Sequence, residues 1–274
     1  MMPSAVKSLK VTYKPVNEEN TFTSGDRVSG EVSLELAKNC SINALWVKFK
    51  GKAEVLWTED YGDHRATHHS KDKNMPSSFK GVAGEIVYLL EAKLSRSVRR
   101  PTKDSTEINF VSKETGTIDP ELMKPQHKSK DKKLKVFNSG RVAMDVKLQR
   151  TVFFQGEGLQ FRARIQNNSS RPIKLKYCFY RKHTFLAKRN QHVNTEDILK
   201  EVGEPIPPSA EEKFTRVVPI PSDVEPSIDN CSIIKVEYGL RVYLDVKYAF
   251  DPKIKFPIVI LSARRVPAAS GFNR

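Results

Sequence analysis

The sequence predicts an all-β protein built from two tandem β-sandwiches. Three features predict this fold: runs in which apolar and polar residues alternate, a Gly followed by an acidic residue ahead of each run, and a second copy of the pattern later in the chain. A period of two with one polar side is typical of strands in half-solvated antiparallel sheets. The length of 274 residues suits two domains of roughly 100 to 150 residues each.

The two alternating runs follow Gly25-Asp26 and Gly156-Glu157. One parity of each run is apolar apart from a single glycine: Val28, Gly30, Val32, Leu34 and Leu36 in the first copy, and Leu159, Phe161, Ala163 and Ile165 in the second. An offset of 131 residues relates the copies and still matches Ile42 to Ile173. Because the register holds through a turn into the next strand, the two domains are predicted to share one design.

A later segment repeats with a larger offset, which predicts a shorter first domain. The segment that starts at Pro76 resembles the one that starts at Pro226, an offset of 150, so the first domain lacks 19 residues. The missing part corresponds to a predicted strand with four apolar residues, Phe214, Val217, Val218 and Ile220. Burying four such side chains contributes about 6–12 kcal/mol, whereas whole domains are stable by about 5–15 kcal/mol. We therefore expect a marginal first domain with a bare sheet edge beside the gap.

The remaining features set the expected boundaries: an incomplete N-terminal sandwich over 1–116, a linker over 117–134, a C-terminal sandwich over 135–262 and a disordered tail over 263–274. The linker is predicted from two prolines, many charges and the lack of periodicity. Residues 194–202 have helix-like spacing, which Gly203 and Pro205 limit to one or two turns. With no secretory signal and no apolar run of about 18 residues, we expect a cytosolic protein without a membrane span.

Charge and cysteine content restrict the partners without naming them. The formal net charge is +15, which attracts phosphorylated segments, anionic lipid and nucleic acid alike. The three cysteines, Cys40, Cys178 and Cys231, are odd in number and widely spaced. This spacing argues against a disulfide framework and against a structural zinc site, so reduced thiols are expected.

Several stretches have distinctive sequences: MPSSFKG from Met75, VFFQGEGL from Val152, IQNNSSRPIK from Ile165, DILKEVGEPIP from Asp197 and FPIVIL from Phe256. They resemble the α-arrestin family, the arrestin domain-containing proteins, and the resemblance covers roughly residues 4–261. It implies the arrestin fold, two immunoglobulin-like β-sandwiches, with strands missing from the N-terminal one of this chain.

The resemblance implies a non-catalytic adaptor that needs no cofactor. Members of the family bind the cytoplasmic tails of membrane receptors and transporters, recruit ubiquitin ligases with WW domains, and so regulate ubiquitination, endocytosis and endosomal sorting. A cytoplasmic protein associated peripherally with the plasma membrane and endosomes is therefore expected.

One departure from the family concerns the ligase. Recruitment uses Pro-Pro-x-Tyr motifs, whereas the one Pro-Pro pair of this sequence, Pro207-Pro208, precedes Ser209 and Ala210. We expect at most an indirect link to the ubiquitin-ligase machinery. A shortened, dominant-negative form of such an adaptor is one alternative.

A basic cluster is the first candidate site. Its lysines fall within eight positions: Lys128, Lys130, Lys132, Lys133 and Lys135. They are candidates for binding a phosphorylated tail or an anionic membrane surface, where each cation contributes about 1 kcal/mol; the alternative is a solvated connector. The basic faces at 48–52 and 174–176 are expected to face solvent. Nucleic acid is not an expected partner, because the aromatic residues fall mostly on the buried parity instead of among the basic residues.

Cys231 is the second candidate. It precedes a predicted strand, and the resemblance matches it to the position through which one member of the family is thought to meet thioredoxin. A redox regulator acting through Cys231 is therefore an alternative function, and a small structural residue is the other interpretation.

Metal binding and catalysis are not expected. His64, His68 and His69 lie near Asp60 and Asp63, but the histidine pair is adjacent in sequence and a flexible loop without metal is predicted there. The chain has no Gly-x-Ser-x-Gly, no phosphate-binding glycine loop and no His-Glu-x-x-His motif.

Overall fold

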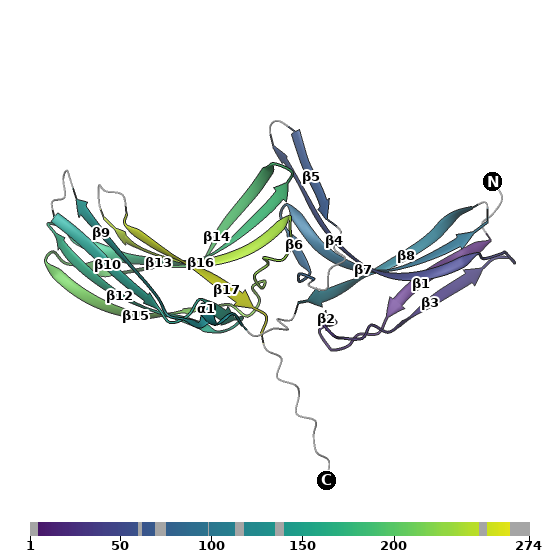
Figure 1. Cartoon of the computed structure of the whole chain (residues 1–274), viewed down its shortest axis with the longest axis horizontal. Helices are drawn as coiled ribbons and strands as arrows, with labels where there is room; N and C mark the ends of the chain where they lie inside the picture. Colours follow the sequence, from purple (N-terminus) through teal and green to yellow (C-terminus); the bar gives the residue numbers. More distant parts are fainter. Residues whose placement is uncertain are drawn as a thin grey trace, which may run out of the picture. The chain divides into compact units, whose positions relative to one another are not determined.

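A computed structural model of the chain describes residues 5–59, 62–68, 75–97, 99–112, 118–134, 140–246 and 251–263, with the backbone alone for residues 59 and 62–68. Apart from one four-residue helix, all regular elements of the described residues are strands (Figure 1). The predicted all-β fold is confirmed.

The chain divides into two compact units. The first unit comprises Met1–Thr115, Thr184–His192 and Ile228–Ile234, and the second comprises Gly116–His183, Val193–Ser227 and Lys235–Arg274. These limits differ from the expected boundaries, because two short segments of the C-terminal half belong to the first unit. Aromatic packing accounts for one of them: the rings of Phe79 and Phe185 lie 6.2 Å apart between centroids, and Phe185 is fully buried.

The N-terminal half forms two sheets of unequal size. A two-stranded sheet pairs β1 with β3, and a six-stranded sheet has the order β2-β8-β7-β4-β5 with β6 also paired to β7. The bounds are β1 Val6–Tyr13, β2 Thr21–Thr23, β3 Gly30–Leu36, β4 Ala44–Glu59, β5 Gly62–His68, β6 Phe79–Gly81, β7 Gly84–Arg96 and β8 Arg99–Val111.

The C-terminal half forms a four-stranded sheet of order β15-β12-β10-β9 and a five-stranded sheet of order β11-β17-β16-β13-β14. The bounds are α1 Pro120–Met123, β9 Gln126–Leu134, β10 Gly140–Leu148, β11 Val152–Phe154, β12 Gly158–Ser169, β13 Ile173–Ala187, β14 Asn190–Ile206, β15 Ala210–Pro219, β16 Ile234–Asp245 and β17 Lys253–Leu261.

The topology shows the predicted duplication directly. The orders β2-β8-β7-β4-β5 and β11-β17-β16-β13-β14 correspond strand for strand, and the outer pairs β2–β8 and β11–β17 are both parallel. The opposite sheets differ, because β1-β3 corresponds only to β10-β12. Within the described residues, β9 and β15 have no counterpart in the N-terminal half, so β3 lacks a partner on its second edge, as the internal comparison predicted.

The repeated Gly-acid pair forms the same turn in both halves. Gly25 and Gly156 have φ angles of +91° and +81°, a region in which glycine is the least strained residue. The acid that follows each glycine accepts a hydrogen bond from the amide three positions before that acid: Thr23 N donates to Asp26 Oδ2 at 2.7 Å, and Phe154 N donates to Glu157 Oε2 at 2.8 Å. The motif therefore links a short parallel strand to the alternating strand in each half.

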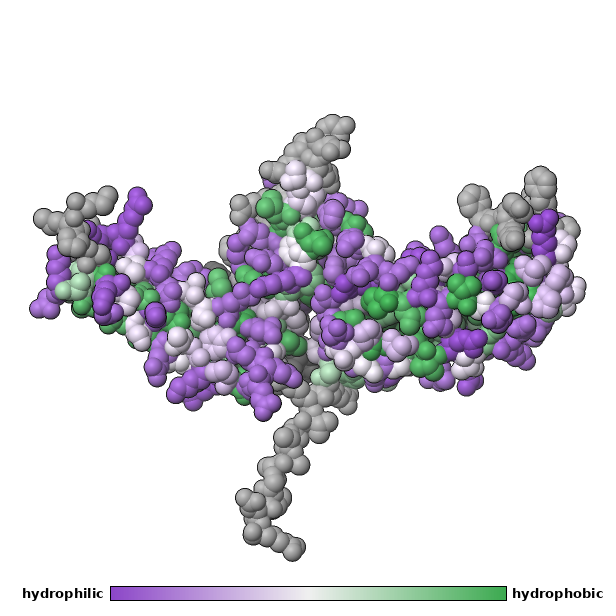
Figure 2. Space-filling view, turned by 180° about the vertical axis from the view of Figure 1, so that it is seen from behind, coloured by the Kyte–Doolittle hydropathy of each residue, from purple (hydrophilic) through white to green (hydrophobic). Residues whose placement is uncertain are grey.

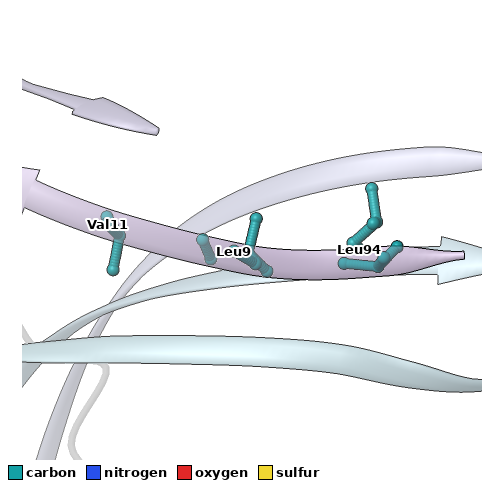
Figure 3. Close-up of a cluster of buried hydrophobic side chains, with 5 residues drawn as sticks. Leu9, Val11 and Leu94 are labelled. Carbon is teal, nitrogen blue, oxygen red and sulfur yellow. The ribbon is translucent and has the colours of Figure 1, made fainter. Parts of the chain in front are cut away.

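A small core joins the two sheets of the N-terminal half. Figure 3 shows Leu9 and Val11 of β1 beside Leu94 of β7. Val6 and Ala92 complete the buried cluster, and Val32, Leu34, Cys40 and Leu90 pack against it while partly exposed. The two-stranded sheet thus covers β7, and its coverage of β4 is described below.

Two expectations about irregular segments were wrong. Most of the predicted linker is strand β9, which pairs with β10 from Gln126↔Leu148 to Leu134↔Gly140. Alternation was hidden because polar and charged residues, four of them lysines, occupy both faces of the strand up to Lys133. The helix-like stretch 194–202 lies within strand β14, whose residues contact β13: Arg181 bonds Glu196 at 2.6 Å, and Tyr177 donates to Glu201. Cross-strand pairing outweighs the local spacing there.

The segment predicted as a histidine-rich loop is also different. Gly62–His68 forms strand β5, which pairs with β4 from Ala53↔His68 to Glu59↔Gly62. His64 and His68 therefore lie on a strand, whereas Asp60 and His69 lie outside the described residues. This segment contains few apolar residues, so its sequence shows no alternation from which the pairing could have been predicted.

Candidate functional site

Four lysines of the basic cluster lie on β9, the edge strand of the four-stranded sheet, whose second edge pairs with no strand of the described residues. Residues two apart on a strand share a face, so Lys128, Lys130 and Lys132 lie on the same side of β9 as the buried Leu134, and Lys133 lies on the opposite side. Lys135 lies outside the described residues. Strand β9 therefore divides the predicted cluster between its two sides; we call Lys128, Lys130 and Lys132 the β9 lysine row.

The first lysine of this row is held in place. Lys128 Nζ donates to the backbone oxygen of Lys255 at 2.7 Å and lies 5.1 Å from the ring centroid of Phe256. Lys130 is exposed and has no ion-pair partner among the residues that the structure describes. The row presents positive charge beside unpaired backbone groups of an edge strand, an arrangement that suits an extended anionic segment and also discourages unspecific pairing.

A shallow polar groove of about 250 Å³ lies beside β9. It is lined by Ser129, Lys130, Asp131, Ala143, Met144, Asp145, Arg164 and Gln166. Most of its charges are already paired: Asp131 with Arg141 at 2.8 Å and Asp145 with His127 at 2.6 Å. Although partial burial opposes ionisation of Asp145, hydrogen bonds from His127 and Ser129 lower its pKa. The groove is therefore electrostatically balanced and lacks the excess cations that a phosphate site needs.

The second candidate, Cys231, is buried. Its exposed fraction is 4%, and it borders a cavity of about 10 Å³ in the first unit together with Gly51, Lys52, Ala53, Pro76, Ile86, Tyr88 and Asn230. Burial and the neighbouring Cys231 raise the pKa of Tyr88, whose hydroxyl donates to the Pro76 oxygen at 2.7 Å. A thiol in this position has to become exposed before it can react with a partner.

The other two cysteines also lack the features of a reactive thiol. Cys178 is fully buried, and burial with a hydrogen bond to Asp197 raises its pKa to about 12. Cys40 is partly buried against the small core of the first unit. The structure contains no disulfide among these three residues, all of which it describes.

The third candidate surface lies on β4, and its residues were not predicted from the sequence. Leu45, Val47 and Phe49 of β4 are paired with Leu94, Ala92 and Leu90 of β7. Directly opposed residues share a face of the sheet, and Leu94 and Ala92 are fully buried, so the three β4 side chains point to the inner side of the sandwich. Nevertheless they are 45%, 51% and 43% exposed. We call these three residues the β4 face. The feature of the sequence that points to their exposure is the missing strand.

The molecular surface is otherwise mostly polar. Figure 2 shows hydrophilic residues spread over the face in view, with hydrophobic residues in smaller groups between them. The basic residues at 48–52 and 174–176 fit this picture: Lys50 pairs with Glu91 at 2.7 Å and Lys176 with Asp245 at 2.8 Å. No group of three or more metal-ligand side chains occurs in the described part of the chain. Nor does any helix described there have the length and apolar character required to cross a membrane.

Comparisons with known proteins connect this geometry to a family. Residues 10–74 match the family described as "Arrestin (or S-antigen), N-terminal domain", and residues 138–265 match "Arrestin (or S-antigen), C-terminal domain". Thioredoxin-interacting protein of Rattus norvegicus is 26% identical over 317 residues, with 98% of this chain and 79% of the relative covered. The Homo sapiens protein of that name is 27% identical over 318 residues, with the same coverage.

The alignments also bear on the missing strand. Each runs over more positions than this chain has residues, so the relatives contain residues without a counterpart here. This agrees with the shorter N-terminal half. The chain carries an arrestin N-terminal domain followed by an arrestin C-terminal domain, and it is homologous to thioredoxin-interacting protein of the α-arrestin family.

Proposed function

We propose that this protein is a non-catalytic, arrestin-type adaptor in membrane-protein trafficking. The observation that carries the proposal is the pair of arrestin domains in sequence, folded as two halves with the same order of strands in the larger sheet. Within the α-arrestins, the sequence motifs described above favour a relationship to arrestin domain-containing protein 3 and its relatives. Its partners would be cytoplasmic tails of receptors or transporters, and its place the cytoplasmic side of the plasma membrane and endosomes.

The recognition mode follows from the free strand edges. An extended tail can add to a sheet edge through main-chain hydrogen bonds, while neighbouring side chains select its sequence. The β9 lysine row places cations along such an edge, and charge-assisted hydrogen bonds to phosphate or carboxylate oxygens are stronger than neutral ones. The adaptor would therefore bind phosphorylated or acidic tails more tightly than unmodified, neutral ones.

The decisive experiment compares tail peptides with and without phosphate. Replacing Lys128, Lys130 and Lys132 by Ala should weaken binding of a phosphorylated receptor-tail peptide by about tenfold and leave the unmodified peptide nearly unchanged. The control variant replaces three exposed lysines elsewhere in the second unit, Lys174, Lys235 and Lys253, so that the loss of net charge is equal. Equal weakening by both variants would assign the effect to overall charge and contradict a role for β9.

A membrane surface is the second source of anions. Vesicles of phosphatidylcholine with and without phosphatidylserine would show whether the lysine row binds lipid in place of tails. Each basic residue near an anionic surface contributes about 1 kcal/mol, so loss of three should release most of the bound protein. Colocalisation with endosomes in cells, reduced by the same variant, would support the trafficking role.

The link to ubiquitination is expected to be indirect. Pro207-Pro208 precedes Ser209 and Ala210 and offers no tyrosine to a WW domain. A pull-down with a WW-domain ligase should therefore recover little of this chain. Strong direct binding would refute this part of the proposal, while weak binding combined with retained cargo binding would favour the shortened, dominant-negative form.

A redox role through Cys231 is the second candidate, because the relatives are named for an interaction with thioredoxin. The burial of Cys231 requires the segment 228–234 to open first. A thioredoxin variant that traps mixed disulfides should then capture the wild-type chain and not Cys231→Ser. Absence of any adduct with the wild type would dispose of this function.

A further inference from the structure

We propose that the free edge of β3, together with the β4 face, accepts one extended segment from a partner protein. The segment would carry apolar residues at every second position and Lys or Arg at positions between them. The proposal goes beyond the proposed function, because it concerns a second sheet edge and a segment of opposite charge, and it does not depend on the identity of the cargo. We call this surface the acceptor face.

The two parts of the acceptor face are adjacent. Val32 and Leu34 of β3 pack against the same small core as Leu90 of β7. Leu90 is paired with Phe49, and the rings of Phe49 and Tyr88 stack with centroids 5.7 Å apart. A strand added beside β3 would thus lie over the exposed inner side of β4.

The second half of the chain shows what such a strand does. There β15 pairs with β12, the counterpart of β3, from Gly158↔Pro219 to Asn167↔Ala210. Its residues Phe214 and Val218 lie on the side of Ala163 and Leu159, which are buried. Leu175, Tyr177 and Phe179 of β13 are only 1%, 3% and 0% exposed in that half. An added strand at β3 would give the β4 face the same cover.

Charge selects the chemistry of the segment. The outward positions of β3 include Glu31 and Glu35. Glu31 has no ion-pair partner in the described residues, and Glu35 pairs with Lys7 at 2.5 Å on the exposed surface and accepts a hydrogen bond from Ser8 at 3.4 Å. In the second half an ion pair joins the outward sides of β12 and β15: Arg164, whose position corresponds to Ser33 of β3, pairs with Glu211 at 2.8 Å. With the acids on β3, a basic residue of the added strand would supply the ion-pair partner that Glu31 lacks.

The same charges argue against a second copy of this chain as the occupant. Two β3 edges that paired with each other would bring Glu31 and Glu35 of one copy beside those of the other, and like charges directly opposed are destabilising. The net charge of +15 adds repulsion between copies. A basic, alternating segment of a different protein places opposite charge beside Glu31 and Glu35.

The test uses the full chain and a seven-residue peptide, the length of β3, with Lys at odd and Val or Phe at even positions. Binding should slow hydrogen exchange of amides in residues 30–36 at least tenfold at saturation. Three matched peptides define the mode: one with Glu for Lys, one with the apolar order scrambled, and one with a central N-methyl group that removes a backbone donor. Each should bind at least tenfold more weakly.

Two variants separate the acceptor face from other surfaces. Val47→Thr should weaken peptide binding about fivefold, while Val217→Thr, at a residue of β15 that is 58% exposed on the outer side, should not change it. Glu31→Gln should weaken binding and reduce its dependence on salt. Protection at other edges, equal binding of the Glu peptide, or no effect of Val47→Thr would each overturn the proposal. If tails still bind through the β9 lysine row, the adaptor function stands without it.

Discussion

The inner sides of β4 and β13 occupy equivalent places in sheets of the same strand order, yet only one is covered. Leu45, Val47 and Phe49 are about half exposed, and the residues 130 positions later, Leu175, Tyr177 and Phe179, are buried. The difference lies in the opposite sheet, which among the residues that the structure describes has two strands in one half and four in the other. Alternation along a strand therefore decides which side chains point inward, whereas the number of strands opposite decides whether they are buried.

The two halves share the packing around one phenylalanine–tyrosine pair. The ring of Phe179 stacks on Tyr238 at 5.6 Å, as Phe49 does on Tyr88 at 5.7 Å. The two tyrosine hydroxyls also donate to backbone oxygens of the preceding segment, Pro76 at 2.7 Å and Glu225 at 2.6 Å. The loss of strands from the N-terminal half is thus local, and the packing around the paired aromatic residues is kept.

The largest expected difference between the halves concerns the paired phenylalanines. Phe179→Ala removes a fully buried ring and should lower the free energy of unfolding by about 3–5 kcal/mol. Phe49→Ala removes a ring that is 43% exposed and should cost about 1–2 kcal/mol. Denaturant unfolding of the whole chain, read by hydrogen exchange in each half, gives both values. Equal losses would mean that β4 is covered in solution.

A smaller, equal effect is expected at the paired tyrosines. Tyr88→Phe and Tyr238→Phe keep the rings and remove only the hydroxyls, leaving the carbonyls of Pro76 and Glu225 without these donors. Each change should cost about 1–2 kcal/mol of unfolding free energy. Similar values would support the conclusion that both halves keep the same packing around these tyrosines. A loss confined to Tyr238→Phe would show that the N-terminal half is looser around Tyr88 than its geometry indicates.

The smallest effect is a pH dependence confined to one half. Burial, reinforced by Arg181, lowers the pKa of His183 despite opposing contributions from Glu225 and Glu196, and the equivalent position in β4 is Ala53. Because the folded pKa lies below the unfolded one, the unfolded state binds the proton more tightly. Stability of the second unit is then complete above about pH 6.5 and falls as the pH drops through that value towards the folded pKa.

The comparison variant for this effect is His183→Gln. Denaturant unfolding between pH 7.5 and pH 5.5 should show a larger loss of stability for the wild type than for the variant. A variant that loses as much as the wild type would place the acid sensitivity elsewhere in the chain.

The duplicated pattern could be predicted from sequence because it depends on local chemistry. Gly25 and Gly156 precede acids that bond back to the chain, and the alternating residues that follow fix which side of β3 and β12 faces inward. The missing strand was also accessible, since an offset that grows from 131 to 150 locates the gap. Both signals lie in short stretches of the chain.

The parts that could not be predicted depend on distant partners. Strand β9 consists almost entirely of polar and charged residues and takes its conformation from pairing with β10. Strand β14 takes its own from β13, against a helix-like spacing. The segments 184–192 and 228–234 join the first unit through contacts such as Phe185 with Phe79. The burial of Cys231 likewise depends on residues that are distant in sequence, so it could not be predicted.

Hydrogen exchange of β3 and β12 in the unliganded chain tests the central claim most directly. β12 is paired on both edges, by β10 and β15, and β3 is paired by β1 alone within the described residues. We predict protection along the whole of residues 161–167, which pair on both edges, and, in residues 30–36, protection only of amides that bond to β1, with the alternate amides exchanging rapidly. Uniform protection of β3 to the level of β12 would contradict the account, because it would require a second strand beside β3.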